Sequence, residues 1–390
     1  MAQSKNQSSK LAVKIKVVGI GGAGGATIGR LIKAKINNIE YIAINTDFKS
    51  LDSIKGKVQK IKIGKKITKG LGTGMNLELG RMAIEENINE VKKSLNNADL
   101  IFIVSGLGGG TGSVVTPIVA ELAKKNGALV IGVMTTPFIF EGAQRKHIAD
   151  EALKKIIHRV DAMVTIPNSR LLQTIDKSTP LLEAFNISAE ILKQAIEGIY
   201  NILNLPGLIN IDFVEVKSVI ESAGETILGM GTAEGADRAR QAAKLALENP
   251  LIDISIKGAK KVLCTISGGP DLTMNEVYEV TQEITTQIGK DAQIIFGAVT
   301  DDNLKNQVKV TIVATGFSQL HSYMPIFEAF HKKEFTETPL PQKSSIKEEK
   351  KEILKIEPIS KQEYKSKFQN NSELSEDELE IPAYLRKKKG

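Results

Sequence analysis

The chain has 390 residues, 42% of them hydrophobic, which is enough for two domains with their own cores and for further segments outside them. No apolar run reaches the ~20 residues of a membrane-spanning helix, and the net charge of +7 comes without a basic stripe of stacking aromatics, so neither membrane insertion nor nucleic-acid binding is indicated. The single cysteine, Cys264, excludes an internal disulfide and fits a cytoplasmic protein, and four isolated histidines give no metal-ligand spacing.

Strand-like and helix-like segments alternate over residues 14–178, after a polar leader at residues 1–13 that is expected to be disordered. The expected strands are residues 15–18, 41–45, 100–104, 129–133 and 162–166. Such alternation is typical of an α/β domain with a parallel sheet covered by helices on both faces. Sheets of this kind bind their ligands at the carboxyl ends of the strands.

Three glycine-rich loops follow strands of this region. They are residues 19–25, which contain G-x-G-x-x-G, residues 70–76, and residues 106–113, which lack the lysine of a Walker A loop. Glycines let backbone N–H groups converge on an anion, and the N-terminus of a following helix adds positive potential. Three such loops in one domain favour a mononucleotide that is wrapped on several sides.

The loop residues expected to hold that nucleotide are Gly21, Gly22, Gly24, Gly25, Gly72, Thr73, Gly74, Gly108, Gly109, Gly110, Thr111 and Gly112. An alternative is an NAD-dependent oxidoreductase, because residues 19–24 with Asp47 about 20 residues further on match a dinucleotide fingerprint. That alternative leaves two glycine loops unexplained, and no hydride-transfer histidine or lysine is evident.

Residues 179–205 are expected to form one long central helix, since apolar residues recur every four positions from Ile187 to Leu203 and Pro206 with Gly207 ends the pattern. A smaller α/β domain is expected over residues 206–317. Its expected strands are residues 261–266, 293–298 and 309–314, and its expected helices are residues 236–247 and 275–287.

The composition changes after Phe317. Residues 318–375 are rich in Lys, Glu, Ser, Pro and Gln, which predicts a disordered linker. Residues 376–390 combine an acidic run, a short apolar patch and a basic end. An apolar patch on a disordered tail has no core to join, so this segment is expected to be a peptide that docks on a partner.

The order of these elements resembles the FtsZ family, the bacterial relatives of tubulin. The matching stretches are residues 15–22, 45–47, 108–112, 137–142, 166–168, 206–213 and 381–386. Residues 108–112, Gly-Gly-Gly-Thr-Gly, match the signature of the tubulin/FtsZ superfamily, whereas the loop at Asn210–Asp212 and the terminal peptide point to FtsZ rather than tubulin. The resemblance covers roughly residues 14–317 and the last fifteen residues.

The resemblance implies a cytoplasmic GTPase that polymerises head to tail into the division ring at mid-cell. It implies GTP or GDP as the ligand, with Mg²⁺ held mainly by the nucleotide and no metal site of the protein's own. Glu141 is expected to contact the ribose, Arg145 the ribose and phosphate region, and Asn168, Phe185 and Glu190 the guanine. The expected catalytic residues, supplied to the next subunit, are Asn210, Asp212 and Glu215. Residues 376–389 are expected to bind a membrane-tethering adaptor and division regulators, so that the membrane is reached only indirectly.

Several positions depart from the family pattern. Gly25 and Ala26 stand where the family usually has Asn, Val114 replaces a Gly, and Ser169 an Asp; Ala189 and Glu190 replace an Asn-Asp pair, and Glu215 an Asp. These changes leave open a non-hydrolysing assembly protein of the same fold that binds nucleotide without turnover. Single residues also have simpler readings: Asp212 as a helix N-cap, Arg145 as a solvated charge and Phe185 as core.

Overall fold

The computed structural model describes residues 13–36, 38–176, 178–204, 207–248, 256–288 and 291–317. The expected leader, except Val13, the linker at 318–375 and the docking peptide at 376–390 all lie outside these residues. None of the helices in the described part of the chain has the length and apolarity to cross a membrane.

The N-terminal domain is built on a seven-stranded sheet whose strands are all parallel, in the order β3-β2-β1-β4-β5-β6-β8. The strands are β1 (Ile15–Ile20), β2 (Ile39–Asn45), β3 (Gln59–Lys62), β4 (Leu100–Gly106), β5 (Leu129–Thr136), β6 (Ala162–Pro167) and β8 (Gly224–Glu225). The five expected strands and their parallel pairing are confirmed, each strand being one to three residues longer than expected. The short strands β3 and β8 were not predicted.

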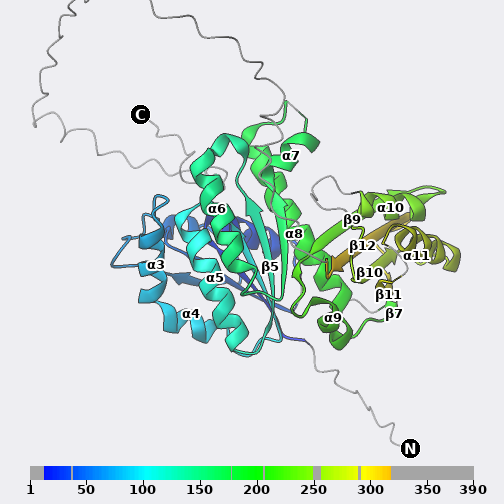
Figure 1. The fold of residues 1–390 in the computed structure, drawn as a ribbon, viewed down its shortest axis with the longest axis horizontal. Coiled ribbons are helices and arrows are strands. Elements are labelled where there is room, and N and C mark those ends of the chain that lie inside the picture. The colour runs from blue at the N-terminus through cyan, green and yellow to red at the C-terminus, as the bar shows by residue number, and fades with distance from the viewer. Residues whose placement is uncertain are drawn as a thin grey trace, which may run out of the picture. The chain divides into compact units, whose positions relative to one another are not determined.

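Helices cover both faces of this sheet (Figure 1). They are α1 (Gly21–Lys33), α2 (Phe48–Asp52), α3 (Leu77–Glu86), α4 (Ile88–Ser94), α5 (Gly110–Lys125), the 3-10 turn η1 (Ile139–Glu141), α6 (Ala143–Ile156), α7 (Asn168–Thr174) and α8 (Leu181–Asn204). Successive residues of a strand point to opposite faces, so Phe102 joins the core beneath α1 and α8, whereas Ile101 and Ile103 join the core beneath α3 to α6. Burial on both faces explains why the strands are almost wholly apolar.

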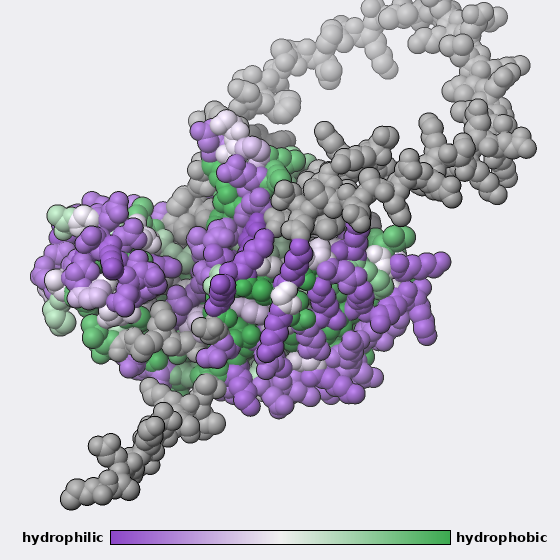
Figure 2. Space-filling model, turned by 180° about the vertical axis from the view of Figure 1, so that it is seen from behind, coloured by the Kyte–Doolittle hydropathy of each residue, from purple (hydrophilic) through white to green (hydrophobic). Residues whose placement is uncertain are grey.

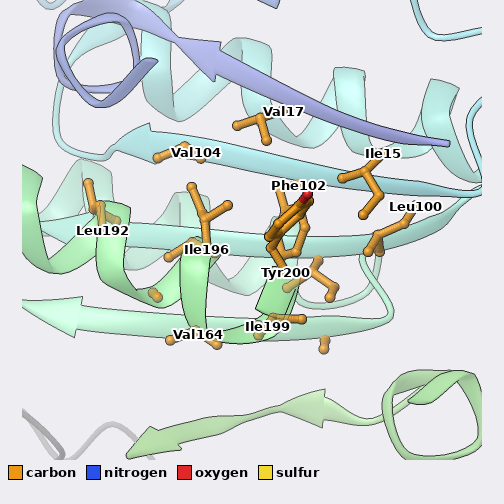
Figure 3. Close-up of a cluster of buried hydrophobic side chains, with 14 of the residues drawn as sticks. Ile15, Val17, Leu100, Phe102, Val104, Val164, Leu192, Ile196, Ile199 and Tyr200 are labelled. Carbon is orange, nitrogen blue, oxygen red and sulfur yellow. The ribbon is translucent and has the colours of Figure 1, made fainter. Parts of the chain in front are cut away.

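The long helix α8 confirms the expected central helix, and it begins directly after Pro180. Its residues Leu192, Ile196 and Ile199 pack over β4 and β6 (Figure 3). On its other side Gly198 lets β12 approach, since a Cβ at Gly198 would stand 3.1 Å from Thr311 Cγ2. The helix therefore contacts both domains.

The C-terminal domain has a five-stranded sheet in the order β7-β11-β10-β12-β9, in which only β10 and β11 are parallel. Its elements are β7 (Gly207–Ile209), α9 (Phe213–Ile220), β9 (Ile227–Glu234), α10 (Arg238–Leu247), β10 (Lys261–Gly268), α11 (Met274–Ile288), β11 (Gln293–Thr300) and β12 (Gln307–Thr315). The three expected strands and two expected helices are confirmed. Strand β9 was missed because its glycines weaken the strand pattern; Gly229 and Gly231 instead let α10 lie close, since added Cβ atoms would meet Ala246 O and Ala242 O.

The buried guanidinium of Arg238 connects α10 to α11 in this domain through ion pairs. Arg238 Nε lies 2.6 Å from Glu276 Oε1, and Arg238 Nη1 lies 2.5 Å from Asp271 Oδ2. The Arg238 side chain is only 9% exposed. Hydrogen bonding from Arg238 holds the pKa of the Glu276 carboxyl below its usual range. Both helices thus begin at one charged cluster.

We expect Arg238→Ala to lower the free energy of unfolding by about 3 kcal/mol, because it leaves the largely buried Glu276 carboxylate, 15% exposed, without its cation. Urea denaturation measures the loss, and Arg240→Ala, an exposed arginine two residues on, is the control, with an expected change under about 0.5 kcal/mol. The carboxylate of Glu276 stabilises the fold at neutral pH, and this stabilisation is lost as the pH falls through its lowered pKa. The difference in free energy of unfolding between wild type and Arg238→Ala should therefore become smaller in acid. A difference that does not change with pH would contradict the stabilising role of the Arg238–Glu276 ion pair.

Candidate nucleotide-binding site

The three glycine loops meet at the N-terminus of α5. A Cβ built on Gly21 would stand 3.6 Å from Gly112 N, which places the first loop against the third. Thr111 Oγ1 lies 2.7 Å from Thr46 Oγ1 at the end of β2, and both hydroxyls are buried. The first turn of α5 holds no acidic residue, so its positive end is not neutralised from within the helix.

Some of the predicted binding glycines serve close packing between these segments. A Cβ on Gly110 would meet Thr73 Oγ1 and would stand 2.7 Å from Asn76 O, and a Cβ on Gly112 would meet Gly106 O. Gly24 is equally tight, 2.5 Å from Val104 O, whereas Gly25 is buried and faces Ile54 Cδ1 at 3.3 Å. Whether these four glycines also contact a ligand stays a prediction.

Other predicted glycines face open space. Cβ atoms built on Gly22, Gly74 and Gly109 would have no atom within 4 Å. Gly109 is the N-cap of α5, so its backbone lies at the positive end of that helix. An anion at this point would meet backbone N–H groups without a side chain in the way.

Two further loop residues hold the shape of the third loop. Gly108 has a φ of +98°, a conformation that favours glycine, and its N–H donates to Ser113 Oγ at 2.9 Å. A Cβ on Gly108 would stand 3.0 Å from Arg145 O, so the loop lies directly against α6. Ser113 and Thr46 were not predicted as site residues, because a single hydroxyl residue carries no signal in sequence. Gly72 lies beside Asp47, which caps α2 by accepting from Ser50 N at 3.1 Å.

Glu141 and Arg145 lie together on the side of the glycine loops next to α6. Glu141 Oε1 accepts from Phe138 N at 3.0 Å, and Glu141 Oε2 lies 3.6 Å from Arg145 Nη1. The side chains are 8% and 15% exposed, so Arg145 is not a freely solvated charge. The ion pair holds both side chains in place beside the backbone of Gly108.

Asn168 and Phe185 lie close to these two residues. Ser188 Oγ donates to Asn168 Oδ1 at 2.7 Å, which leaves the Asn168 amide to present its N–H donors. Phe185 is half-buried and meets the edge of Phe138, with ring centroids 5.1 Å apart. Glu190 lies 2.7 Å from Lys193 in an ion pair, and its place beside a base stays a prediction.

Asn210, Asp212 and Glu215 lie elsewhere, between β7 and the first turn of α9. Asp212 Oδ1 accepts from Glu215 N at 2.7 Å and Glu215 Oε2 accepts from Asp212 N at 2.9 Å, so Asp212 is an N-cap in a reciprocal capping box. All three residues are exposed. Phe185 lies near the N-terminal end of α8, whereas these three residues follow its C-terminal end (Figure 1). The helix has 24 residues and is about 36 Å long at the rise of an α-helix, so most of that length separates them from Phe185.

No group of three or more His, Cys, Asp or Glu that could hold a metal ion occurs among the described residues.

Comparison with known proteins matches residues 14–176 to the Tubulin/FtsZ family, GTPase domain, and residues 224–318 to the FtsZ family, C-terminal domain. An empty FtsZ dimer from M. jannaschii is 41% identical, with a TM-score of 0.74 over 79% of this chain and 89% of that one. The chain belongs to the FtsZ family. A mutant FtsZ from M. jannaschii is 42% identical, with a TM-score of 0.74 over 78% of this chain and 92% of that one.

The GDP-bound CetZ1 monomer from Haloferax volcanii shares the FtsZ fold at 20% identity, with a TM-score of 0.69 over 82% of this chain and 98% of that one. The two domains of the present FtsZ-family chain thus carry the family's GTPase and C-terminal folds, and the expected fold class and resemblance are confirmed. The family is one of GTP-binding proteins that form filaments.

Proposed function

We propose that this protein binds GTP or GDP at the glycine loops and hydrolyses GTP only when a second copy adds its Asp212 segment. The observation that carries the proposal is the separation of the two half-sites by most of the length of α8. They cannot meet within one chain, but a head-to-tail stack of identical chains brings each Asp212 segment to the next set of glycine loops. Phosphoryl transfer depends on positioning and charge control, and a carboxylate can orient the attacking water.

Exposed apolar residues support a contact between the two ends. Leu71, Ile139 and Phe140 are 87%, 68% and 52% exposed and come from the loops around the glycines. Leu208 and Val214 are 74% and 72% exposed and flank Asp212. Side chains of this kind gain stability when a partner removes them from water.

Sedimentation with GTP and with a non-hydrolysable analogue, alongside phosphate release, tests the proposal. We expect both nucleotides to drive pelleting and GTP alone to release phosphate in step with filament mass. Pelleting without phosphate release would favour the non-hydrolysing assembly protein, for which the loss of the family's Asn at the buried Ala189 and the Glu190–Lys193 pair are the motivating observations. Nucleotide-independent behaviour, with NAD binding, would favour the oxidoreductase.

In cells we propose that the filaments form the division ring, in the cytoplasm at mid-cell, with Mg²⁺ bound through the nucleotide. The Asn168 amide and the Phe185 ring would hold the guanine, Glu141 and Arg145 the ribose and phosphate region. Glu190 pairs with Lys193, so a contact between Glu190 and the base would require that ion pair to open.

Ser188→Ala should reduce the preference for GTP over ATP, because it frees the Asn168 amide to rotate and present its oxygen instead of its N–H groups. Competition of each nucleotide against a fluorescent GTP analogue measures the preference. The control is Ser218→Ala, which removes a serine hydroxyl from α9. An unchanged preference in Ser188→Ala would show that the Ser188–Asn168 bond does not select the base.

Removal of residues 376–390 should leave GTP-dependent assembly intact and end recruitment to the membrane. The apolar residues of this segment, among them Leu379, Ile381 and Tyr384, suit a groove on a membrane-bound adaptor. The four basic residues at 386–389 add roughly 1 kcal/mol each near anionic lipid, too little to anchor the chain alone. The measurement is fluorescence imaging of the truncated protein in cells without a full-length copy. A membrane ring that persists would contradict the role of residues 376–390 in recruitment.

A further inference from the structure

Lysines concentrate at one edge of the N-terminal sheet, in and around β3. Residues 49–69 hold eight lysines and one aspartate, a net charge of +7 that equals the formal net charge of the whole chain. The lysines are Lys49, Lys55, Lys57, Lys60, Lys62, Lys65, Lys66 and Lys69. Positive and negative charges balance over the rest of the chain, so this lysine edge is a local source of positive potential.

The fold directs these lysines outward. Strand β3 is the last strand of the sheet, with β2 as its neighbour, and its Ile61 is fully buried. Lys57, Lys65 and Lys66 stand exposed in the turns on either side of β3. The N-terminal domain is largely covered by hydrophilic residues in the view of Figure 2.

One acidic side chain of the segment neutralises part of this charge, since Asp52 Oδ2 lies 2.7 Å from Lys62 Nζ. The Glu86 carboxylate lies beside Lys66 and accepts from its backbone N–H. Lysine on an edge strand also prevents pairing with other sheets, but lysines in the flanking turns do nothing for that purpose. The remaining positive charge of the lysine edge therefore suits an acidic partner.

We propose that the lysine edge binds the acidic segment at residues 373–380 of the same chain. This segment holds Glu373, Glu376, Asp377, Glu378 and Glu380 and no basic residue. The 55 residues from 318 to 372 connect it to the end of the described part of the chain. A linker of that length with the expected random-coil dimensions would span about 40 Å on average and at most about 190 Å, which is long enough for the contact.

This contact does not depend on nucleotide. The acidic segment overlaps residues 376–380 of the docking peptide, including Leu379, so an adaptor would compete with the lysine edge for them, whereas residues 381–389 stay available. The contact makes the acidic segment a tether that keeps the docking peptide close to the N-terminal domain. Ionic contacts between exposed groups are individually weak, so the docking depends on several of them together and is sensitive to salt.

The test uses the full chain with a spin label at position 375. Cys264 is buried and its pKa is raised to about 12 by desolvation, so a label added to Ser375→Cys reacts at one site. We expect the label to be largely immobile at about 0.1 M salt and mobile at about 1 M, where the Debye length falls from about 10 Å to about 3 Å.

The triple variant Lys57→Gln, Lys65→Gln, Lys66→Gln should free the label at low salt, with a severalfold fall in the immobile fraction. The matched control, Lys92→Gln, Lys93→Gln, Lys244→Gln, removes three exposed lysines from α4 and α10 and should leave the label immobile. Carbodiimide crosslinking of dilute protein should join the lysine edge to residues 373–380, and mixing with isotope-labelled chain shows whether the joined residues belong to one copy.

A label that is mobile at low salt in the wild type, or equally immobile in the triple variant, overturns the proposal. Binding to phosphatidylglycerol vesicles that the triple variant loses, with the label mobile throughout, would assign the lysine edge to a membrane surface instead. Crosslinks that join only different copies would overturn the contact within one chain.

Discussion

Asp212→Asn should leave nucleotide binding within about twofold of wild type and lower phosphate release by at least about 100-fold, the range seen when a positioned acid–base group is removed. Asparagine keeps the N-cap, so α9 begins as before, whereas Asp212→Ala also loses the cap at a cost of about 1 kcal/mol. Comparison of the two variants therefore separates the carboxylate's charge from its structural role. The control is Glu221→Gln, which neutralises an exposed carboxylate at the other end of α9.

Mixing gives the sharper result for the same site. Asp212→Asn retains intact glycine loops, and a Gly110 variant retains an intact Asp212 segment. A filament of both contains one kind of interface in which both halves are intact, so partial phosphate release should return. Loss of nucleotide binding by dilute Asp212→Asn would contradict the model of a site shared between subunits, as would full activity of either variant alone.

Alanine substitutions at neighbouring glycines should separate packing from ligand contact. Gly110→Ala forces a Cβ against Thr73 and Asn76, so we expect the nucleotide-free protein to lose about 1–3 kcal/mol of stability and nucleotide affinity to fall with it. Gly109→Ala adds a methyl group where no protein atom lies within 4 Å. It should leave the stability of the nucleotide-free protein unchanged and weaken nucleotide binding alone.

Urea denaturation without nucleotide and titration with a fluorescent GTP analogue measure the two effects. Gly29→Ala is a suitable control, because its added Cβ also meets open space but lies within α1, away from the loops. It should stabilise the helix by up to about 1 kcal/mol and leave nucleotide affinity unchanged. Normal affinity in both Gly109→Ala and Gly110→Ala would place the nucleotide away from α5.

The sequence was a good guide where burial imposes a simple pattern. Strands buried on both faces require unbroken apolar runs, which is why β4 and β5 were predicted to within a few residues. Strand β9 was not predicted, because Gly229 and Gly231 are required for the close approach of α10 and have low strand propensity. Such contacts depend on segments distant in the chain, and local patterns do not encode them.

The same limit applies to the candidate site. Glycine spacing indicated which loops converge, but it did not distinguish Gly110, which is crowded by Thr73, from Gly109, which faces open space. Nor did it predict the Thr46–Thr111 contact, which joins residues 65 positions apart. For Asp212 the sequence allowed a cap or a catalytic carboxylate, and the geometry permits both at once.

The reciprocal bonds between Asp212 and Glu215 have a consequence for the kinetics of a filament. Each carboxylate is held by a backbone N–H before any partner arrives, so the segment loses little conformational freedom on docking. Under the proposed function, an incoming subunit would meet a preorganised surface, and the slow step before hydrolysis would be correct stacking of the subunits rather than folding of a loop. A substitution that unwinds the first turn of α9 would then slow turnover without any contact with the nucleotide.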